Sequence, residues 1–239
     1  MFKELVDHTW RGARIGFGEA LASDGHGFWP GEAPAMTRAT PARQAEFAAG
    51  RAAARQALRA IGLVPFAIPM GPDRAPIWPS GVIGSITHHD GRCLAVAARR
   101  QAMAGLGIDV EPLAPLAADL WDEILLPAER AWLSGQADDL QAVLARMIFA
   151  AKEATYKAIY PRTRQVVGFD AMQIRPDPAR GRYTATLTRA YGPLPSGARL
   201  QGQLAFRDGL ICTLIGLPVG TAPAVDADAE MDCFHAIAS

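Results

Sequence analysis

Two amphipathic helical patterns, each followed by short β-rich runs, constrain the possible folds of this chain more than any other feature. Residues 41–62 are alanine-rich, carry apolar side chains at three- and four-residue steps and end at Gly62, which predicts a helix with a glycine stop. Residues 138–160 carry a second apolar stripe, which predicts another amphipathic helix. The repeated order of a helix and then strands predicts an α+β fold of two similar halves, although the halves share no sequence identity.

Glycine- and proline-containing turns separate the β-rich runs. In the first half these runs are VIGSITHHDG, CLAVAARR and AGLGIDVEPL, which predict three strands. In the second half the runs VGFDAMQIRP, RYTATLTRA, RLQGQLAFRDG and LICTLIGLP predict an antiparallel meander. Residues 116–134 predict a further helix, and residues 1–40 predict a strand or two with loops. We expect an N-terminal half at 1–111, a C-terminal half at 112–218 and a loosely held acidic tail at 219–239.

The charges balance, because 24 Lys+Arg stand against 24 Asp+Glu and give a formal net charge of zero. A neutral chain has no global field for a phosphate backbone, so we expect no nucleic-acid partner, although a local basic cluster can still hold one anion. The cysteines Cys93, Cys212 and Cys233 lack CxxC spacing, which disfavours disulfides and structural zinc and favours a cytoplasmic location. No secretory signal and no apolar stretch of about 18 residues is present, so no membrane span is expected.

Two acidic residues, Asp109 and Glu111, occupy alternate positions of the predicted strand GIDVE. Side chains two residues apart on a strand point to the same face, so both carboxylates project together. Paired hard oxygen donors suit Mg²⁺, which takes one or two protein carboxylates and completes its shell with water and substrate phosphate. The alternative is an edge strand that carries two solvated acids.

Three charged residues, Lys152, Glu153 and Lys157, interrupt the most apolar stretch of the second long helix. Glu153 and Lys157 stand at positions i and i+4, a spacing that is common in helix-surface ion pairs of little energetic weight. Charges among apolar neighbours more often border a cleft. Both interpretations remain open from the residues alone.

A set of basic and polar groups could bind an anion. Arg51 and Arg55 lie one turn apart on the first long helix, and Arg43 lies two turns earlier, which is also the pattern of a solvated helix face. Thr87 and His88 end a predicted strand, where they could donate hydrogen bonds to an anion or form part of an ordinary surface. The chain has no GxxxxGK[ST] loop, no GxGxxG after a strand and no GxSxG elbow, which disfavours the nucleotide and acyl-transfer sites built on those motifs.

The order of these motifs resembles the 4′-phosphopantetheinyl transferase superfamily. GIDVE and FAAKEATYK look like its two signature blocks, while RxxEFxxxRxxAR and GPDRAPIWPSGVIGSITH look like the monomeric group of the enterobactin-synthase component D enzymes and the mycobacterial phosphopantetheinyl transferases. The resemblance covers residues 41–170. It implies a pseudo-twofold pair of α+β halves with the active site in the cleft between them.

The resemblance also implies a reaction. Members of the family move the phosphopantetheine arm of coenzyme A onto a serine of an apo acyl or peptidyl carrier protein, with Mg²⁺, and release adenosine 3′,5′-bisphosphate. Siderophore, nonribosomal peptide and polyketide synthesis are the pathways to expect. The carrier is expected to dock near residues 112–140.

Residue roles carry over by position in the motifs. The metal ligands implied are Asp109, Glu111 and Glu153; Glu153 is also the implied base, Lys157 supports the leaving phosphate, and Asp109 completes the catalytic set. The implied coenzyme A contacts are Arg43, Arg51, Arg74, Ala75, Pro76, Thr87, His88, Asp109, Lys152, Glu153, Lys157 and Val167. Arg74 departs from the lysine of several relatives, and the role of Arg55 stays open.

Two alternatives remain beside this transferase. A catalytically silent module of the same fold would bind coenzyme A or a carrier protein without transfer. A different Mg²⁺-dependent phosphotransferase would accept a nucleotide, which the missing Walker loop disfavours.

Overall fold

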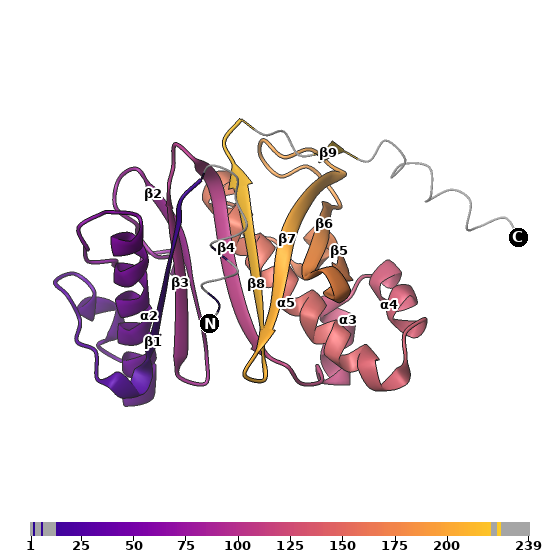
Figure 1. Cartoon of the computed structure of the whole chain (residues 1–239), viewed down its shortest axis with the longest axis horizontal. Helices are drawn as coiled ribbons and strands as arrows, with labels where there is room; N and C mark the ends of the chain where they lie inside the picture. Colours follow the sequence, from indigo (N-terminus) through magenta and orange to yellow (C-terminus); the bar gives the residue numbers. More distant parts are fainter. Residues whose placement is uncertain (1, 3–5, 7–12, 221–223, 226–239) are drawn as a thin grey trace, which may run out of the picture.

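Two β-sheets stand side by side, each with one long helix packed on it (Figure 1). The computed structural model describes Phe2, Val6, residues 13–220 and residues 224–225. The chain begins with β1 (Ile15–Leu21), η1 (Ala22–Asp24), η2 (Ala33–Met36), α2 (Pro41–Ala60), β2 (Val82–His89) and β3 (Arg92–Arg99). It continues with β4 (Met103–Pro112), η3 (Ala118–Leu120), α3 (Trp121–Ile124), α4 (Pro127–Ser134), α5 (Asp138–Thr163), η4 (Phe169–Ala171), β5 (Met172–Asp177), η5 (Pro178–Arg180), β6 (Arg182–Leu187), β7 (Ala198–Arg207), β8 (Leu210–Pro218) and β9 (Ala224–Val225). The predicted α+β class is confirmed.

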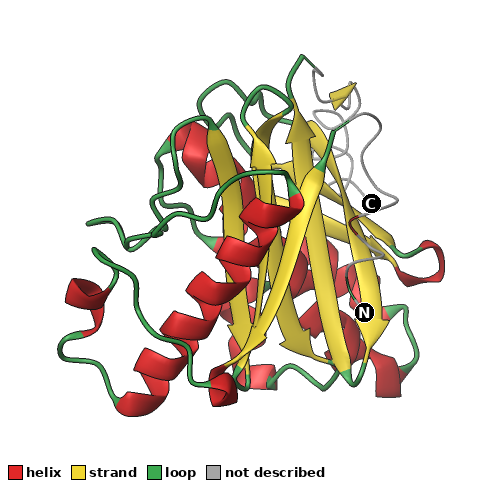
Figure 2. Cartoon of the chain, turned by 60° about the vertical axis from the view of Figure 1, so that its left-hand side comes forward, coloured by secondary structure: helices red, strands yellow, loops and turns green. Residues whose placement is uncertain are grey.

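The N-terminal sheet has the antiparallel order β1-β3-β2, and α2 lies across it (Figure 2). The helix begins after Thr40, whose hydroxyl oxygen accepts a hydrogen bond from the Arg43 N–H at 3.3 Å, with Pro41 in the first turn. It ends before Gly62, which adopts a φ of 75°. A side-chain cap, a first-turn proline and a left-handed glycine are common boundary signals, so the predicted helix is confirmed.

The C-terminal sheet has the order β4-β8-β7-β6-β5, and β9 pairs with β7. The predicted meander is confirmed, except that β5 begins at Met172 because residues 169–171 form the short helix η4. Although β4 precedes the predicted division after residue 111, it is hydrogen-bonded to β8 of this sheet. The predicted acidic tail at 219–239 lies mostly outside the described residues.

The predicted helix at 116–134 is wrong as one element, because the chain forms η3, α3 and α4 there. Leu125 and Leu126 are extended, with ψ values of 128° and 155°. Leu126 precedes Pro127, and a proline disfavours helical geometry in the residue before it. Pro127 itself fits the first turn of α4, so the break and the new start share one cause.

Each long helix sits directly on the first strand of its sheet at glycines. A Cβ at Gly18 of β1 would lie 2.0 Å from the Ala53 carbonyl oxygen, and a Cβ at Gly107 of β4 would lie 1.9 Å from the Ala154 carbonyl oxygen. Gly16 and Gly105, two residues earlier on the same strands, approach the helix carbonyl oxygens in the same way. Because only a residue without a side chain permits this approach, the helix packs on its sheet in the same way in both halves.

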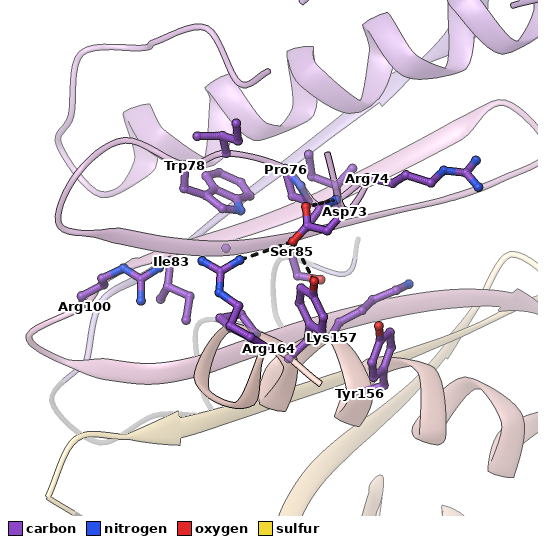
Figure 3. Close-up of a pocket in the computed structure, with 16 residues that line it drawn as sticks. Asp73, Arg74, Pro76, Trp78, Ile83, Ser85, Arg100, Tyr156, Lys157 and Arg164 are labelled. Atoms are coloured by element: carbon purple, nitrogen blue, oxygen red, sulfur yellow. Dashed lines mark hydrogen bonds and ion pairs between the residues drawn. The ribbon is translucent and has the colours of Figure 1, made fainter. Parts of the chain in front are cut away.

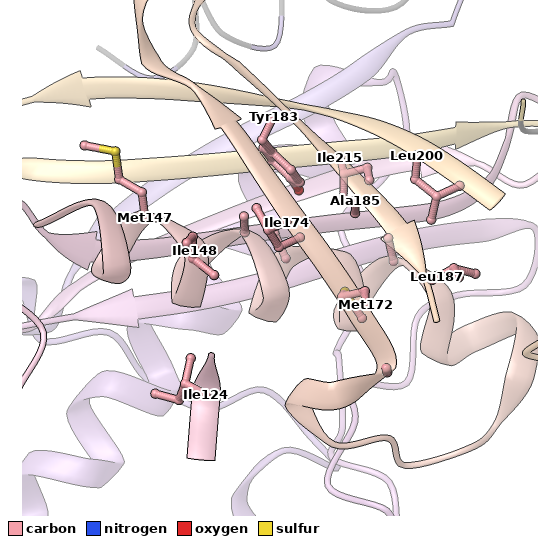
Figure 4. Close-up of a cluster of buried hydrophobic side chains, with 14 of the residues drawn as sticks. Ile124, Met147, Ile148, Met172, Ile174, Tyr183, Ala185, Leu187, Leu200 and Ile215 are labelled. Atoms are coloured by element: carbon pink, nitrogen blue, oxygen red, sulfur yellow. The ribbon is translucent and has the colours of Figure 1, made fainter. Parts of the chain in front are cut away.

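The largest core cluster fills the space between α5 and the C-terminal sheet (Figure 4). A second cluster joins the two sheets and includes Leu94 of β3 together with Ile108 and Leu214 of β4 and β8. Cys93 and Cys212 are buried free thiols, for which burial raises the pKa. Within the described part of the chain, no helix is long and apolar enough to cross a membrane.

Candidate active site

The candidate site lies on the seam where β2 of one sheet meets β4 of the other. Side chains of β2 join the two strands: the Ser85 hydroxyl oxygen accepts from the Ile108 N–H at 3.2 Å, and the Thr87 hydroxyl oxygen accepts from the Val110 N–H at 3.3 Å. The alternation of strand side chains places both hydroxyls on the same face of β2. The seam therefore holds Thr87 and Asp109 together.

Asp109 is the centre of this seam and is only 4% exposed. Its Oδ1 accepts hydrogen bonds from the Thr87 hydroxyl at 2.9 Å and from the Lys157 ammonium at 2.6 Å. Its Oδ2 is buried and has no hydrogen-bond partner in the described structure. A buried carboxylate oxygen without a partner is costly, so this atom is suited to a cation or a bound donor.

Glu111 and Glu153 are half-buried acids that respond to the charge of Asp109. Burial raises the pKa of Glu111, and Asp109 raises it further, against Arg146. Burial also raises the pKa of Glu153, where Lys157 lowers it and Asp109 raises it. The charge of Asp109 therefore acts on both of the other predicted metal ligands. No metal-binding group of three such side chains is assembled among the described residues.

Arg146 is a member of this site that the sequence did not single out. Its Nη1 donates to Glu111 at 3.0 Å, and its Nη2 donates to the Pro115 carbonyl oxygen at 3.0 Å. Arg146 lies seven residues before Glu153 on α5. Seven residues are about two helical turns, so helical spacing alone could have placed it on the Glu153 face.

Lys152, a predicted coenzyme A contact, directs its ammonium at partners within the protein. Its ammonium is buried and donates to the Ile124 and Phe169 carbonyl oxygens at 2.7 and 2.8 Å, while Glu129 pairs with it at 2.8 Å. An ammonium has three hydrogens to donate, so these partners saturate it. The predicted contact of Lys152 with coenzyme A stays a prediction: its ammonium is turned into the C-terminal core, while the residue also lines the smaller cavity described below.

A cavity of about 420 Å³ opens between residues 71–81, β2 and the end of α5 (Figure 3). Four of the predicted contacts line it: Arg74, Ala75, Pro76 and Lys157. Arg100 and Arg164 also line it and were not predicted. Four basic groups against the single acidic group Asp73 favour an anionic ligand.

Asp73 ties the two sides of this cavity together. Its Oδ2 accepts from the Tyr160 hydroxyl at 2.7 Å and from Arg164 Nη1 at 3.4 Å. The Tyr160 hydrogen bond lowers the pKa of Asp73, and the same bond raises the pKa of Tyr160. No local pattern in the sequence indicates this contact, since its partners come from different halves.

Arg43 and His88 meet outside the larger cavity. Arg43 Nη1 donates to His88 Nε2 at 2.8 Å and to Glu46 at 3.3 Å. Because the guanidinium can only donate, His88 Nε2 accepts and its proton is on Nδ1. Burial lowers the pKa of His88, and Arg43 lowers it further against Glu46, which favours the neutral imidazole.

Arg51 and Arg55 are buried, which excludes the solvated helix face for these two positions. Arg55 pairs with the buried Glu32 at 2.8 Å. Arg51, 7% exposed, has its guanidinium 3.7 Å from the Phe47 ring centroid and donates to the Ile68 carbonyl oxygen at 2.9 Å. Among the described residues no carboxylate is in ion-pair contact with Arg51; burial lowers its pKa to about 10, against the charge of the nearby Glu32.

A smaller cavity of about 110 Å³ shares one lining residue, Tyr156, with the larger cavity. Val167, a predicted contact, lines it together with Lys152, Glu153, residues 166–169 and Met172. The predicted residues therefore form three groups: the larger cavity, the Arg43–His88 and Arg51 region, and the seam with the smaller cavity. Thr87 and Asp109 lie on the seam that separates the two sheets.

Comparison with known proteins identifies relatives along most of the chain. Residues 31–98 match the 4′-phosphopantetheinyl transferase N-terminal domain, and residues 105–213 match the 4′-phosphopantetheinyl transferase superfamily. The chain is 42% identical over 200 residues to the 4′-phosphopantetheinyl transferase Svp of Streptomyces mobaraensis, with 81% of each chain covered. It is 37% identical over 196 residues to the 4′-phosphopantetheinyl transferase PptT of Mycobacterium tuberculosis, covering 79% of this chain and 85% of the relative. Enterobactin synthase component D of Salmonella typhi is 40% identical over 136 residues, which cover 55% of this chain and 54% of that one.

Proposed function

The chain belongs to the 4′-phosphopantetheinyl transferase superfamily, and we propose that it transfers the phosphopantetheine arm of coenzyme A to a serine of an apo carrier protein. One observation carries the proposal beyond family membership. The buried Asp109 carboxylate, held by Thr87 and Lys157, leaves Oδ2 without a partner beside a basic cavity. This pairing of an acidic centre with a basic cavity suits a pyrophosphate ester.

Coenzyme A carries three phosphates, and the basic groups can divide among them. Arg74 and Lys157 line the larger cavity, where the adenosine end would lie against Ala75 and Pro76. Arg51 and the Arg43–His88 pair offer donors on the α2 side. Arginine suits this task because its planar fork binds two phosphate oxygens at once.

The residues present fit Mg²⁺. Asp109 Oδ2 is a buried anionic oxygen without a donor, and Glu111 and Glu153 supply the other carboxylates that the motif implies. These three side chains, which are not assembled around one point in the described structure, would have to converge to hold the ion, and hard oxygen donors are the ligands that Mg²⁺ prefers. When bound, the ion would neutralise charge on the pyrophosphate and polarise the phosphorus under attack.

Two side chains of the protein accept the proton and stabilise the charge that develops during transfer. The carrier serine oxygen bonds to the phosphorus that bears the pantetheine arm, while the pyrophosphate bridge breaks and adenosine 3′,5′-bisphosphate leaves. Glu153 takes the serine proton, directly or through water, and its raised pKa makes it a stronger base than an exposed glutamate. Lys157 stabilises the charge that the leaving phosphate gains.

The carrier proteins of siderophore, nonribosomal peptide and polyketide synthesis are the proposed partners, since all present the same serine. A monomer in a reducing cytoplasm stays our prediction. The buried free thiols Cys93 and Cys212 are compatible with such a compartment.

Incubation with coenzyme A, Mg²⁺ and an apo carrier protein tests the proposal. Mass spectrometry should find a phosphopantetheine adduct on the carrier serine and release of adenosine 3′,5′-bisphosphate. Coenzyme A binding without an adduct on carriers of all three pathways would indicate a silent binding module. Transfer from a nucleoside triphosphate instead would indicate a different phosphotransferase.

A further inference from the structure

Lys152 lines the smaller cavity and forms an ion pair with Glu129, and this pair has no role in the chemistry above. Its side chains are 1% and 0% exposed, and their charged atoms are 2.8 Å apart. Lys152 also donates to the carbonyl oxygens of Ile124, at the end of α3, and of Phe169, in η4. One ammonium thus connects α5 to two other segments.

Glu129 makes matching connections from the other side. Its Oε2 accepts from the Leu126 N–H and its Oε1 accepts from the Ile174 N–H, each at 2.7 Å. The first bond caps α4 and the second reaches β5. The surrounding backbone therefore fixes the direction of the pair: donors surround the carboxylate, and carbonyl oxygens surround the ammonium.

The pair supports one wall of the smaller cavity. Residues 166–169 form that wall, and Lys152 bonds to the carbonyl of its last member, Phe169. The Phe169 ring packs on the Phe149 ring with centroids 5.7 Å apart. Glu153, the proposed base, follows Lys152 in α5 and lines the same cavity, so the pair connects the wall to the residue that performs the chemistry.

A buried ion pair is a poor device for stability alone. The cost of desolvating two charges often equals or exceeds their attraction, and well-packed apolar residues frequently replace such pairs without loss. A pair retained with every hydrogen bond satisfied is better suited to fix the position of the segments that it joins. Here those segments are α4, η4, β5 and α5.

We propose that Lys152 and Glu129 are positioning residues that fix the wall at residues 166–169, and through it the pantetheine arm of coenzyme A beside Glu153. The inference rests on the proposed function. It replaces the expected direct contact of Lys152 with the ligand by an indirect one. It also limits the effect of the pair to the arm, because the adenosine end would lie in the larger cavity.

Calorimetric titration with two ligands tests this. Coenzyme A has the arm, and adenosine 3′,5′-bisphosphate lacks it. For Lys152→Met we expect the Kd of coenzyme A to rise about tenfold, equal to about 1.4 kcal/mol, while the Kd of the bisphosphate stays unchanged. Glu129→Gln keeps the shape and should shift the same ratio in the same direction, and it carries the test where Lys152→Met fails to fold.

A matched control separates positioning from general loss of stability. Leu200→Ala removes a buried side chain of β7 in the same core, away from both cavities. It should lower the melting temperature and leave the ratio of the two Kd values unchanged, because a smaller folded fraction affects both ligands alike.

Three results would overturn the inference: equal losses for both ligands, no loss for either, or the same ratio change in Leu200→Ala. A further readout is kinetic, since Glu129→Gln should raise the KM for coenzyme A more than it lowers kcat. Failure of the unsubstituted protein to bind coenzyme A would instead overturn the proposed function.

Discussion

The Tyr160 hydroxyl donates a 2.7 Å hydrogen bond to the Asp73 carboxylate and so joins α5 to the loop of residues 71–81 across the larger cavity. Arg164 reaches the same carboxylate from the end of α5. A ligand held in this cavity would lie beside this contact.

Tyr160→Phe removes this contact and keeps the ring. We expect coenzyme A to dissociate several-fold faster, because loss of one hydrogen bond to a charged acceptor typically changes an equilibrium by about tenfold or more, while the chemical step is unchanged. Stopped-flow displacement measures the rate. Tyr191→Phe, which removes a hydroxyl bonded to Arg189 away from both cavities, is the control, and equal rates in both variants would contradict the role of Tyr160.

Arg51→Ala should weaken coenzyme A binding more than it slows transfer. A buried guanidinium without a carboxylate partner is positioned for a phosphate, and hydrogen bonds to charged groups contribute about 1.5–3 kcal/mol, so the KM should rise about tenfold to a hundredfold. Arg59→Ala removes an equal charge from the exposed end of the same helix. A KM that rises equally in both variants would mean that Arg51 acts only through the net charge of the protein.

Asp109→Asn keeps the shape of the side chain and removes its charge. Because Asp109 Oδ2 is the proposed metal oxygen and Oδ1 holds Lys157, transfer should fall by at least about a hundredfold, as loss of one preorganised electrostatic group typically does. Circular dichroism should show an unchanged fold. Chelation of Mg²⁺ should abolish transfer in the unsubstituted protein, and full activity of Asp109→Asn would show that the metal is bound elsewhere.

His88 should take up a proton when coenzyme A binds. Its pKa is lowered in the free protein by burial and by Arg43, and a phosphate nearby would raise it. Proton uptake is therefore expected at pH values between the pKa of His88 in the free protein and its pKa in the complex. At about pH 6, near the ordinary imidazole pKa, titrations in buffers of different ionisation enthalpy should report uptake that vanishes well above that range. His88→Gln should abolish the uptake; persistence there would assign the proton to another group.

Gly107→Ala should destabilise the protein, since the added Cβ would lie 1.9 Å from the Ala154 carbonyl oxygen. Overpacking of this kind costs about 1–3 kcal/mol, measured by urea unfolding. Gly18→Ala repeats the clash at Ala53 in the other half. Activity measured on folded protein should fall more in Gly107→Ala, because α5 carries Glu153 and Lys157; a larger loss in Gly18→Ala would contradict this.

The long helices and strands could be predicted because periodicity is local: α2 and β4 follow from patterns within one segment. The common face of Asp109 and Glu111 follows from strand geometry in the same way. The contacts of Asp109 with Thr87, and of Lys152 with Glu129, could not be predicted. They depend on which segments the core brings together, and the residues next to each partner in the sequence carry no signal of that contact.

The burial of Arg51 shows the same limit. Helical spacing placed it beside Arg55 on one face, yet its depth comes from Phe47 and the Ile68 carbonyl. Spacing predicts which residues share a face, while the depth of that face depends on chain segments that arrive from elsewhere.

Hydroxyl groups join β2 to β4, where a continuous sheet would use backbone pairs. The hydroxyls of Ser85 and Thr87 therefore link two sheets whose backbone hydrogen bonds are separate. Separation of the sheets there would expose the core cluster that joins them but would break neither backbone ladder. Enzyme inactivation should consequently begin while most of the circular dichroism signal remains, with Asp109 separated from Thr87 before either sheet melts.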